Sequence, residues 1–132
     1  MKMFRARRRL AGLAGLLVAL AACTPPGPEV IDRSLQPQAT RDAMVYVPVL
    51  PLGMAPPPGV GSVGPVSATG CGPDPSAASV EAVQQLKTRV LMMRGTAVVD
   101  VVLGPGNTAN CANAHAVLAY GIAVAPRGLM YP

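Results

Sequence analysis

The stretch "GPDPSAASVEAVQQLKTRVLMMRG", residues 72–95, decides the fold, because it carries both ends and the apolar stripe of one helix. Asp74 is a good capping residue and Pro75 suits the first helical position. Gly95 suits the left-handed stop that follows a helix. Apolar residues recur at three- and four-residue steps, which predicts a helix over residues 76–93. The positions expected to be buried are Val80, Val83, Leu86, Val90 and Met93. Those expected to face solvent include Gln85, Thr88 and Arg89.

The segments on either side of this helix predict β-strands. Residues 59–71, "GVGSVGPVSATGC", combine small and β-branched residues, which predicts a glycine-rich strand. Residues 96–103, "TAVVDVVL", are β-branched and precede the turn signal "GPGN". Residues 115–125, "HAVLAYGIAVA", alternate between two faces. We expect the helix to approach the small face, which comprises Ala119, Gly121 and Ala123. The larger residues, among which Tyr120 is expected to be packed, are Leu118, Tyr120, Ile122 and Val124.

Together these elements predict a small α+β domain over residues 59–128, followed by a C-terminal tail at residues 129–132. The order strand-helix-strand-strand places one helix on a small sheet of three or four strands. A core built from ~70 residues is marginal and usually needs a covalent staple.

The N-terminus predicts a targeting segment. Five basic residues fall in the first nine positions, and residues 10–22 are then apolar. A bilayer-spanning helix needs roughly 20 apolar residues, so this run has the length of a secretory signal instead. It ends in Leu20-Ala21-Ala22-Cys23, which resembles a bacterial lipobox. Residues 1–22 are therefore predicted to be a lipoprotein signal peptide, and Cys23 the lipidated residue that anchors the protein in the membrane.

The positive charge of the chain belongs to this signal. The formal net charge is +5, but the part after the signal holds six basic and six acidic residues. A basic footprint for nucleic acid is therefore absent from the mature part, which excludes nucleic-acid partners. The residue after Cys23 is Thr24, not the Asp that resembles an inner-membrane retention signal. We therefore expect delivery to the outer membrane.

Residues 24–58 hold nine of the fifteen prolines and predict a tether, assigned with the lipidated cysteine to residues 23–58. Such a segment favours extended polyproline geometry and builds no packed core. At about 3 Å per residue it would reach on the order of 100 Å. Within it, "MVYVPVLPL", residues 44–52, is less polar and leaves three interpretations open. They are an apolar patch in a linker, an edge strand docked on the domain, and a partner-binding segment.

Cys71 and Cys111 remain as a pair once Cys23 is lipidated. A zinc site built on Cys111 and His115 would need four ligands, and only Cys71 and Asp100 could complete the set. A nucleophilic Cys111 would need a lowered thiol pKa and His115 as its base. A disulfide needs no further residue, and by closing a loop of ~40 residues it would stabilise the domain by roughly 4 kcal/mol. We therefore predict a Cys71–Cys111 disulfide and treat His115 as the first residue of a strand.

No other segment predicts an active site or a cofactor site. "GPGNTANC", residues 104–111, matches neither the P-loop nor the dinucleotide-binding pattern. The carboxylates Asp74, Glu81 and Asp100 form no spaced pair. The sequence thus predicts a protein that is not an enzyme and that uses no metal, cofactor or small-molecule substrate.

Two stretches carry a resemblance to a known family. "GPVSATGC", residues 64–71, and "MRGTAVVDVVLGPGNTANCANAHAVLAYGIAV", residues 93–124, resemble the RcsF-like outer-membrane lipoproteins, sensors of the Rcs envelope-stress phosphorelay. The matching pieces are residues 64–67 with Cys71, residues 96–99, Cys111 and residues 121–124. The second cysteine pair of the family is missing, because Val101, Val102, Ala119 and Tyr120 stand there.

The resemblance implies a lipid-anchored protein whose domain faces the periplasm and senses envelope stress through protein contacts upstream of a phosphorelay. The partners it implies are an outer-membrane barrel protein and an inner-membrane regulator, with the tether as a candidate surface-exposed segment. Only Arg33 and Arg41 charge this tether positively, which disfavours charge-based sensing of lipopolysaccharide. The alternative is a structural lipoprotein of an envelope assembly without a signalling role.

Overall fold

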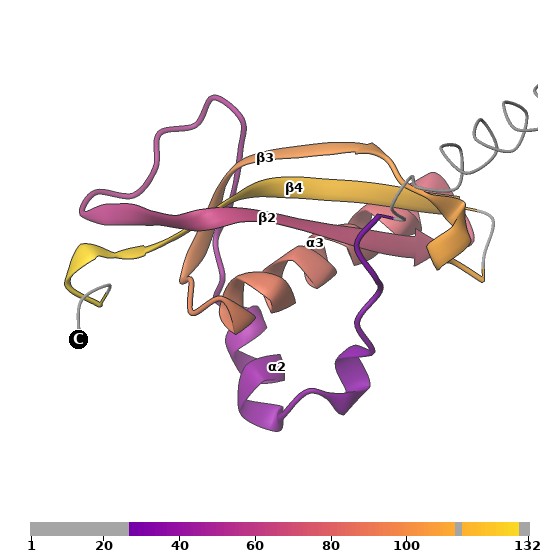
Figure 1. Cartoon of the computed structure of the whole chain (residues 1–132), viewed down its shortest axis with the longest axis horizontal. Helices are drawn as coiled ribbons and strands as arrows, with labels where there is room; N and C mark the ends of the chain where they lie inside the picture. Colours follow the sequence, from indigo (N-terminus) through magenta and orange to yellow (C-terminus); the bar gives the residue numbers. More distant parts are fainter. Residues whose placement is uncertain (1–26, 113–114, 130–132) are drawn as a thin grey trace, which may run out of the picture.

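The computed structural model of the chain describes residues 27–112 and 115–129. The predicted signal peptide, Cys23 and most of the predicted C-terminal tail lie outside these residues. A four-stranded mixed sheet carries one main helix, α3 (Pro75–Met92), on one face (Figure 1). This arrangement confirms the predicted α+β fold class. In the described part of the chain, no helix is both long enough and apolar enough to cross a membrane.

The sheet has the strand order β1-β3-β4-β2. Its central strand β4 (His115–Pro126) pairs antiparallel with β2 (Val60–Gly72) on one side and β3 (Ala97–Pro105) on the other. The short strand β1 (Val49–Pro51) pairs parallel with β3. The register of β3 shifts between Val99 and Val102, where Asp100 takes a left-handed φ of 53°. This bulge returns the next residue, Val101, to the helix side of the sheet.

Helix α3 begins and ends through local hydrogen bonds. The Asp74 side chain accepts from the backbone N–H of Ala77 at 2.8 Å. At the other end, Arg94 rather than Gly95 takes the left-handed conformation, with φ 62°. The backbone N–H of Gly95 then donates to the carbonyl of Val90 at 2.8 Å. This pairing completes a Schellman stop, so the predicted end is right in place and differs in which residue bears the positive φ.

The buried face of α3 is rotated from the predicted stripe. Val80 is 62% exposed, whereas Gln85 and Thr88 are fully buried. The buried residues of the helix are Ala78, Ala82, Gln85, Leu86, Thr88 and Val90. The expectation that Val80 is buried and that Gln85 and Thr88 face solvent was therefore wrong. Glycines of β2 let the backbone of α3 approach the sheet closely, and this close approach suits the small side chains of Ala78 and Ala82.

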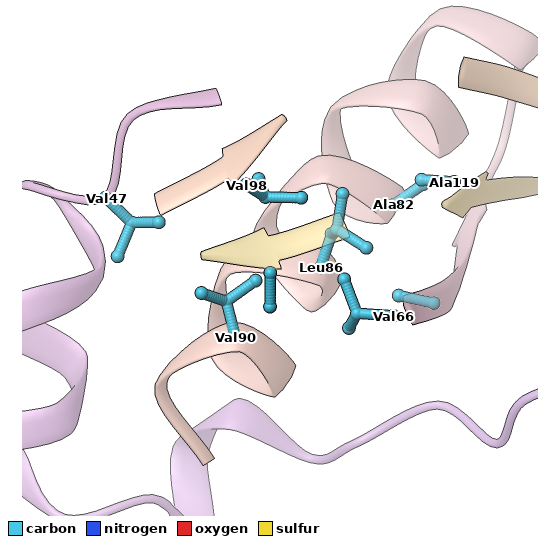
Figure 2. Packing of buried hydrophobic residues seen from close by; sticks show 9 residues of the cluster. Val47, Val66, Ala82, Leu86, Val90, Val98 and Ala119 are labelled. Atoms are coloured by element: carbon cyan, nitrogen blue, oxygen red, sulfur yellow. The ribbon is translucent and has the colours of Figure 1, made fainter. Parts of the chain in front are cut away.

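The core lies between α3 and the sheet (Figure 2). Leu86, Val90 and Val98 are fully buried at its centre. The small residues of β4, Ala119 and Ala123, face the helix as predicted. A second, smaller cluster lies on the opposite face of the sheet and contains Ala97, Val99 and Val124, with Leu50 and Val60 packed against it.

The proline-rich N-terminal segment differs from the predicted tether. Residues 27–51 fold onto the domain through η1 (Arg33–Leu35), α2 (Gln38–Met44) and β1. Met44 and Val47 are buried, and Val47 belongs to the main core. For residues 44–52, the docked edge strand is the interpretation that the structure shows, with Pro51 exposed at the sheet edge. The physical reason is that the apolar side chains between the prolines leave water when the segment packs on the domain. Their burial stabilises the docked segment relative to a free linker.

Candidate functional site: a disulfide corner and two apolar surfaces

A disulfide joins Cys71, near the end of β2, to Cys111, in the loop before β4. The two Cα atoms lie 5.5 Å apart and the bond spans 40 residues. The bond lies at the end of the sheet where β2 ends and β4 begins. Because the two sulfur atoms are bonded to each other, neither is a free thiolate that could act as the nucleophile or metal ligand considered for Cys111.

The loop that contains Cys111 also contacts Gly27, the first residue that the structure describes. Asn107 caps the short helix η2 (Thr108–Asn110) by accepting from the N–H of Ala109 at 2.9 Å. Asn110 then donates from Nδ2 to the carbonyl of Gly27 at 3.1 Å. Gly27 lies beside Thr69 of β2, on the sheet face opposite the helix. The disulfide therefore fixes both the loop and the entry point of the N-terminal segment.

From Gly27 the segment passes the β2 edge and runs along α3 (Figure 1). Gln85 makes a two-way contact with the backbone of Ile31: its Oε1 accepts at 2.9 Å and its Nε2 donates at 2.7 Å. Arg33 forms a forked ion pair with Glu81, at 3.1 and 2.6 Å. These polar contacts explain why Gln85 is buried. The ion pair is about a third exposed and adds at most about 1 kcal/mol.

Asp32 caps the 3-10 turn η1. Its carboxylate accepts from the Ser34 hydroxyl at 2.6 Å and from the Ser34 N–H at 3.0 Å. These two hydrogen bonds, the hydroxyl first, hold the pKa of Asp32 below its ordinary value. The carboxylate is fully exposed, so this cap orders the turn locally.

Replacing Gln85 with alanine should release the N-terminal segment from α3. The change removes both hydrogen bonds to Ile31 and leaves its part-buried N–H and carbonyl without these partners, a loss of about 1–3 kcal/mol. Amide hydrogen exchange at Ile31 should accelerate, while exchange in β4 changes much less. Gln84→Ala is the matched control. Gln84 is the neighbour of Gln85 in α3, and within the described residues its side chain forms no hydrogen bond with Ile31. Unchanged exchange at Ile31 in Q85A would contradict this role.

The first apolar surface is the sheet face opposite α3, which we call the open face. Its positions follow from strand alternation, since Val66 and Ala68 face the helix. No charged residue occupies an open-face position in the register-paired residues of β2, β3 and β4. Tyr120 is 46% exposed there and Ile122 is also exposed, so the expected packing of Tyr120 was wrong. The uncovered middle of the face comprises Pro65, Ser67, Val102, Leu118, Tyr120 and Ile122.

The second apolar surface, which we call the edge groove, runs between α3 and the free part of β3. Two adjoining hollows share Ser79 and Leu103. The groove is lined by Ser79, Val80, Val83, Leu103, Pro105 and His115. His115 starts β4 opposite Gly72, as predicted for a strand-start residue, and closes one end of the groove.

Of the sequence-predicted site residues, the structure brings Cys71 and Cys111 together, and Cys23 lies outside the described residues. Within those residues, no three His, Cys, Asp or Glu side chains are placed to hold a metal ion. Sequence reasoning missed the edge groove, because Val80 was expected to be buried in the core and its exposure depends on the rotation of α3. It also missed the anchoring of the N-terminal segment by Asn110 and Gln85.

No protein-family model matches the chain. A search of the curated proteins likewise finds no significant match.

Proposed function

We propose that this chain is an outer-membrane lipoprotein, anchored through a lipidated Cys23, whose domain faces the periplasm. It acts as an envelope-stress sensor or signalling component upstream of a phosphorelay, through contacts with other proteins. The disulfide supports an extracytoplasmic site, since such bonds persist in oxidising compartments. The edge groove is the observation that carries the proposal of protein contacts.

The edge groove lies beside backbone groups that a partner strand can use. Strand β1 covers β3 only as far as Val101, whose carbonyl accepts from Leu52. Beyond that point Gly106 donates to the carbonyl of Ala116 in β4. By antiparallel alternation, the N–H and carbonyl of Leu103 then point away from β4. Leu103 therefore offers hydrogen bonds to an added strand, and Pro105, which lacks an N–H, limits the pairing to a short stretch.

The partner that fits this groove is a short extended apolar segment of another envelope protein. Its backbone would pair with Leu103, and an apolar side chain would fill the space between Leu103 and Val80, which are 46% and 62% exposed. Main-chain pairing combined with a side-chain pocket is a common mode of peptide recognition. We propose a segment of a barrel protein or of an inner-membrane regulator as this partner.

Photo-crosslinking in whole cells tests the proposal. A photoreactive amino acid at Leu103 should give a discrete adduct with an envelope protein, because this side chain lies in the groove. The matched control is Met92, which is 60% exposed against 46% for Leu103 but lies at the C-terminal end of α3, away from the groove. Adducts absent at Leu103, or equal at both positions, would argue against the groove as the contact site.

Deletion of the chain separates signalling from a structural role. A sensor predicts that an envelope-stress reporter loses its response in the deleted strain. A structural lipoprotein predicts stoichiometric co-purification with an envelope assembly and an unchanged reporter. The identity of the Leu103 adduct then tells whether the partner is a barrel protein or a regulator.

A further inference from the structure

We propose that the open face of the sheet, together with the loop at residues 52–59, rests on the lipid bilayer. The occupant of this apolar surface is the membrane into which the lipid anchor inserts. The inference rests on the proposed lipidation of Cys23, and goes beyond it by giving the domain a defined orientation.

The first argument is the length of chain between the anchor and the folded domain. Gly27 already packs on the domain, and in the sequence only residues 24–26 separate it from Cys23. Four residue steps span at most about 14 Å, against the order of 100 Å expected of a free tether. The domain is therefore held close to the bilayer surface.

The second argument is where this connection enters the domain. A Cβ on Gly27 would lie 3.8 Å from the hydroxyl of Thr69 and 3.7 Å from the Asn110 amide. Thr69 occupies an open-face position, because its neighbours Ala68 and Gly70 face the helix. The anchor thus attaches at the open face and brings this face, rather than α3, toward the lipid.

The third argument is the separation of charge between the two layers. Among residues 27–112 and 115–129, the charged side chains other than Asp100, in the β3 bulge, and Arg127, just after β4, belong to α3, its ends and the N-terminal segment packed beside it. These residues are Glu29, Asp32, Arg33, Arg41, Asp42, Asp74, Glu81, Lys87, Arg89 and Arg94. The stretch from residue 43 to residue 73 contains no charged residue. One layer of the domain is thus suited to water and the other to an apolar surface.

The fourth argument is the apolar projection beside the open face. The loop at residues 52–59 rises on the side of the sheet away from α3 (Figure 1). Leu52 is 68% exposed and Met54 is also exposed. Tyr120 adds an aromatic ring with a polar tip, a combination favoured at membrane interfaces. Such apolar contacts add to the anchoring that the lipidated Cys23 provides.

The edge groove stays accessible in this orientation. Its α3 residues, Ser79, Val80 and Val83, belong to the layer that faces away from the bilayer. A membrane-seated sheet therefore leaves the proposed protein contact open, and the two surfaces serve different partners.

The chain contains no tryptophan, which allows a direct test. Tyr120→Trp and Leu52→Trp each introduce one fluorescent reporter at an exposed position of the proposed membrane surface. Val80→Trp is the matched control, exposed to a similar degree in the edge groove. The mature lipidated protein would be reconstituted into vesicles of phosphatidylethanolamine and phosphatidylglycerol, with and without brominated acyl chains.

We expect the emission of Y120W and L52W to shift to the blue in vesicles and to be quenched by the brominated lipid. Emission from V80W should change little. Vesicle flotation, measured in parallel, reports the anchor itself. Flotation without quenching at positions 52 and 120 overturns the proposed orientation and leaves the proposed function standing. A blue shift without quenching shows that protein, such as a second copy, covers the face, and also overturns it. Failure to float rejects the lipid anchor and the orientation with it.

Discussion

Replacing both Cys71 and Cys111 with serine should destabilise the domain by about 4 kcal/mol, because the bond closes a loop of 40 residues. The folded unit comprises about 100 residues, for which a net stability of roughly 5–15 kcal/mol is ordinary. The lost bond therefore removes a large share of the total. The midpoint of urea-induced unfolding should fall accordingly, and the slope of the transition reports any change in the compactness of the unfolded chain.

The wild-type protein under reducing conditions is the natural control for this variant. If the disulfide acts only as a staple, the reduced wild type and the double variant should unfold at the same urea concentration. Exchange at the amide of Ala109, whose N–H donates to Asn107 within the loop, should also accelerate in both, since the loop loses the bond that fixes it. A midpoint unchanged from the oxidised wild type would contradict the assigned role of the bond.

The elements of the fold could be predicted because their signals are local. The Asp74-Pro75 start and the apolar spacing predicted a helix over residues 76–93, and α3 spans Pro75–Met92. The β-branched stretches predicted three strands whose observed bounds differ by no more than two residues. The cysteine pair could be predicted by elimination, because only two thiols remained once Cys23 was assigned to the predicted lipid anchor.

The rotation of α3 and the docking of residues 27–51 could not be predicted, because both depend on contacts between distant residues. Gln85 is buried only because the backbone of Ile31, 54 residues away, supplies its partners. Thr88 is covered by Met44, whose sulfur accepts from its hydroxyl at 3.1 Å. A prediction from helix periodicity alone therefore places both polar residues in solvent. Because the docking of residues 27–51 was not predicted, the expected core was smaller than the observed one.

Gly70→Ala should be the most damaging single substitution in the sheet. A Cβ at this position would overlap the backbone of α3 at Ala82 and Ala78. Backbone atoms cannot move aside as the end of a flexible side chain can, so the helix would have to shift as a whole. Overpacking of a core costs about 1–3 kcal/mol and occasionally more, and we expect the upper end here. The unfolding midpoint should fall strongly.

Gly104→Ala is the matched control, because the position also lies in a strand and nothing surrounds its Cβ within 4 Å. The control should leave stability unchanged or slightly raised, since alanine reduces the entropy of the unfolded chain. A second variant tells which atoms cause the clash. If the obstacle is the backbone of α3, adding Ala82→Gly to Gly70→Ala should not restore stability. Recovery in the double variant would place the conflict in the Ala82 side chain and contradict the close backbone approach of α3 to β2.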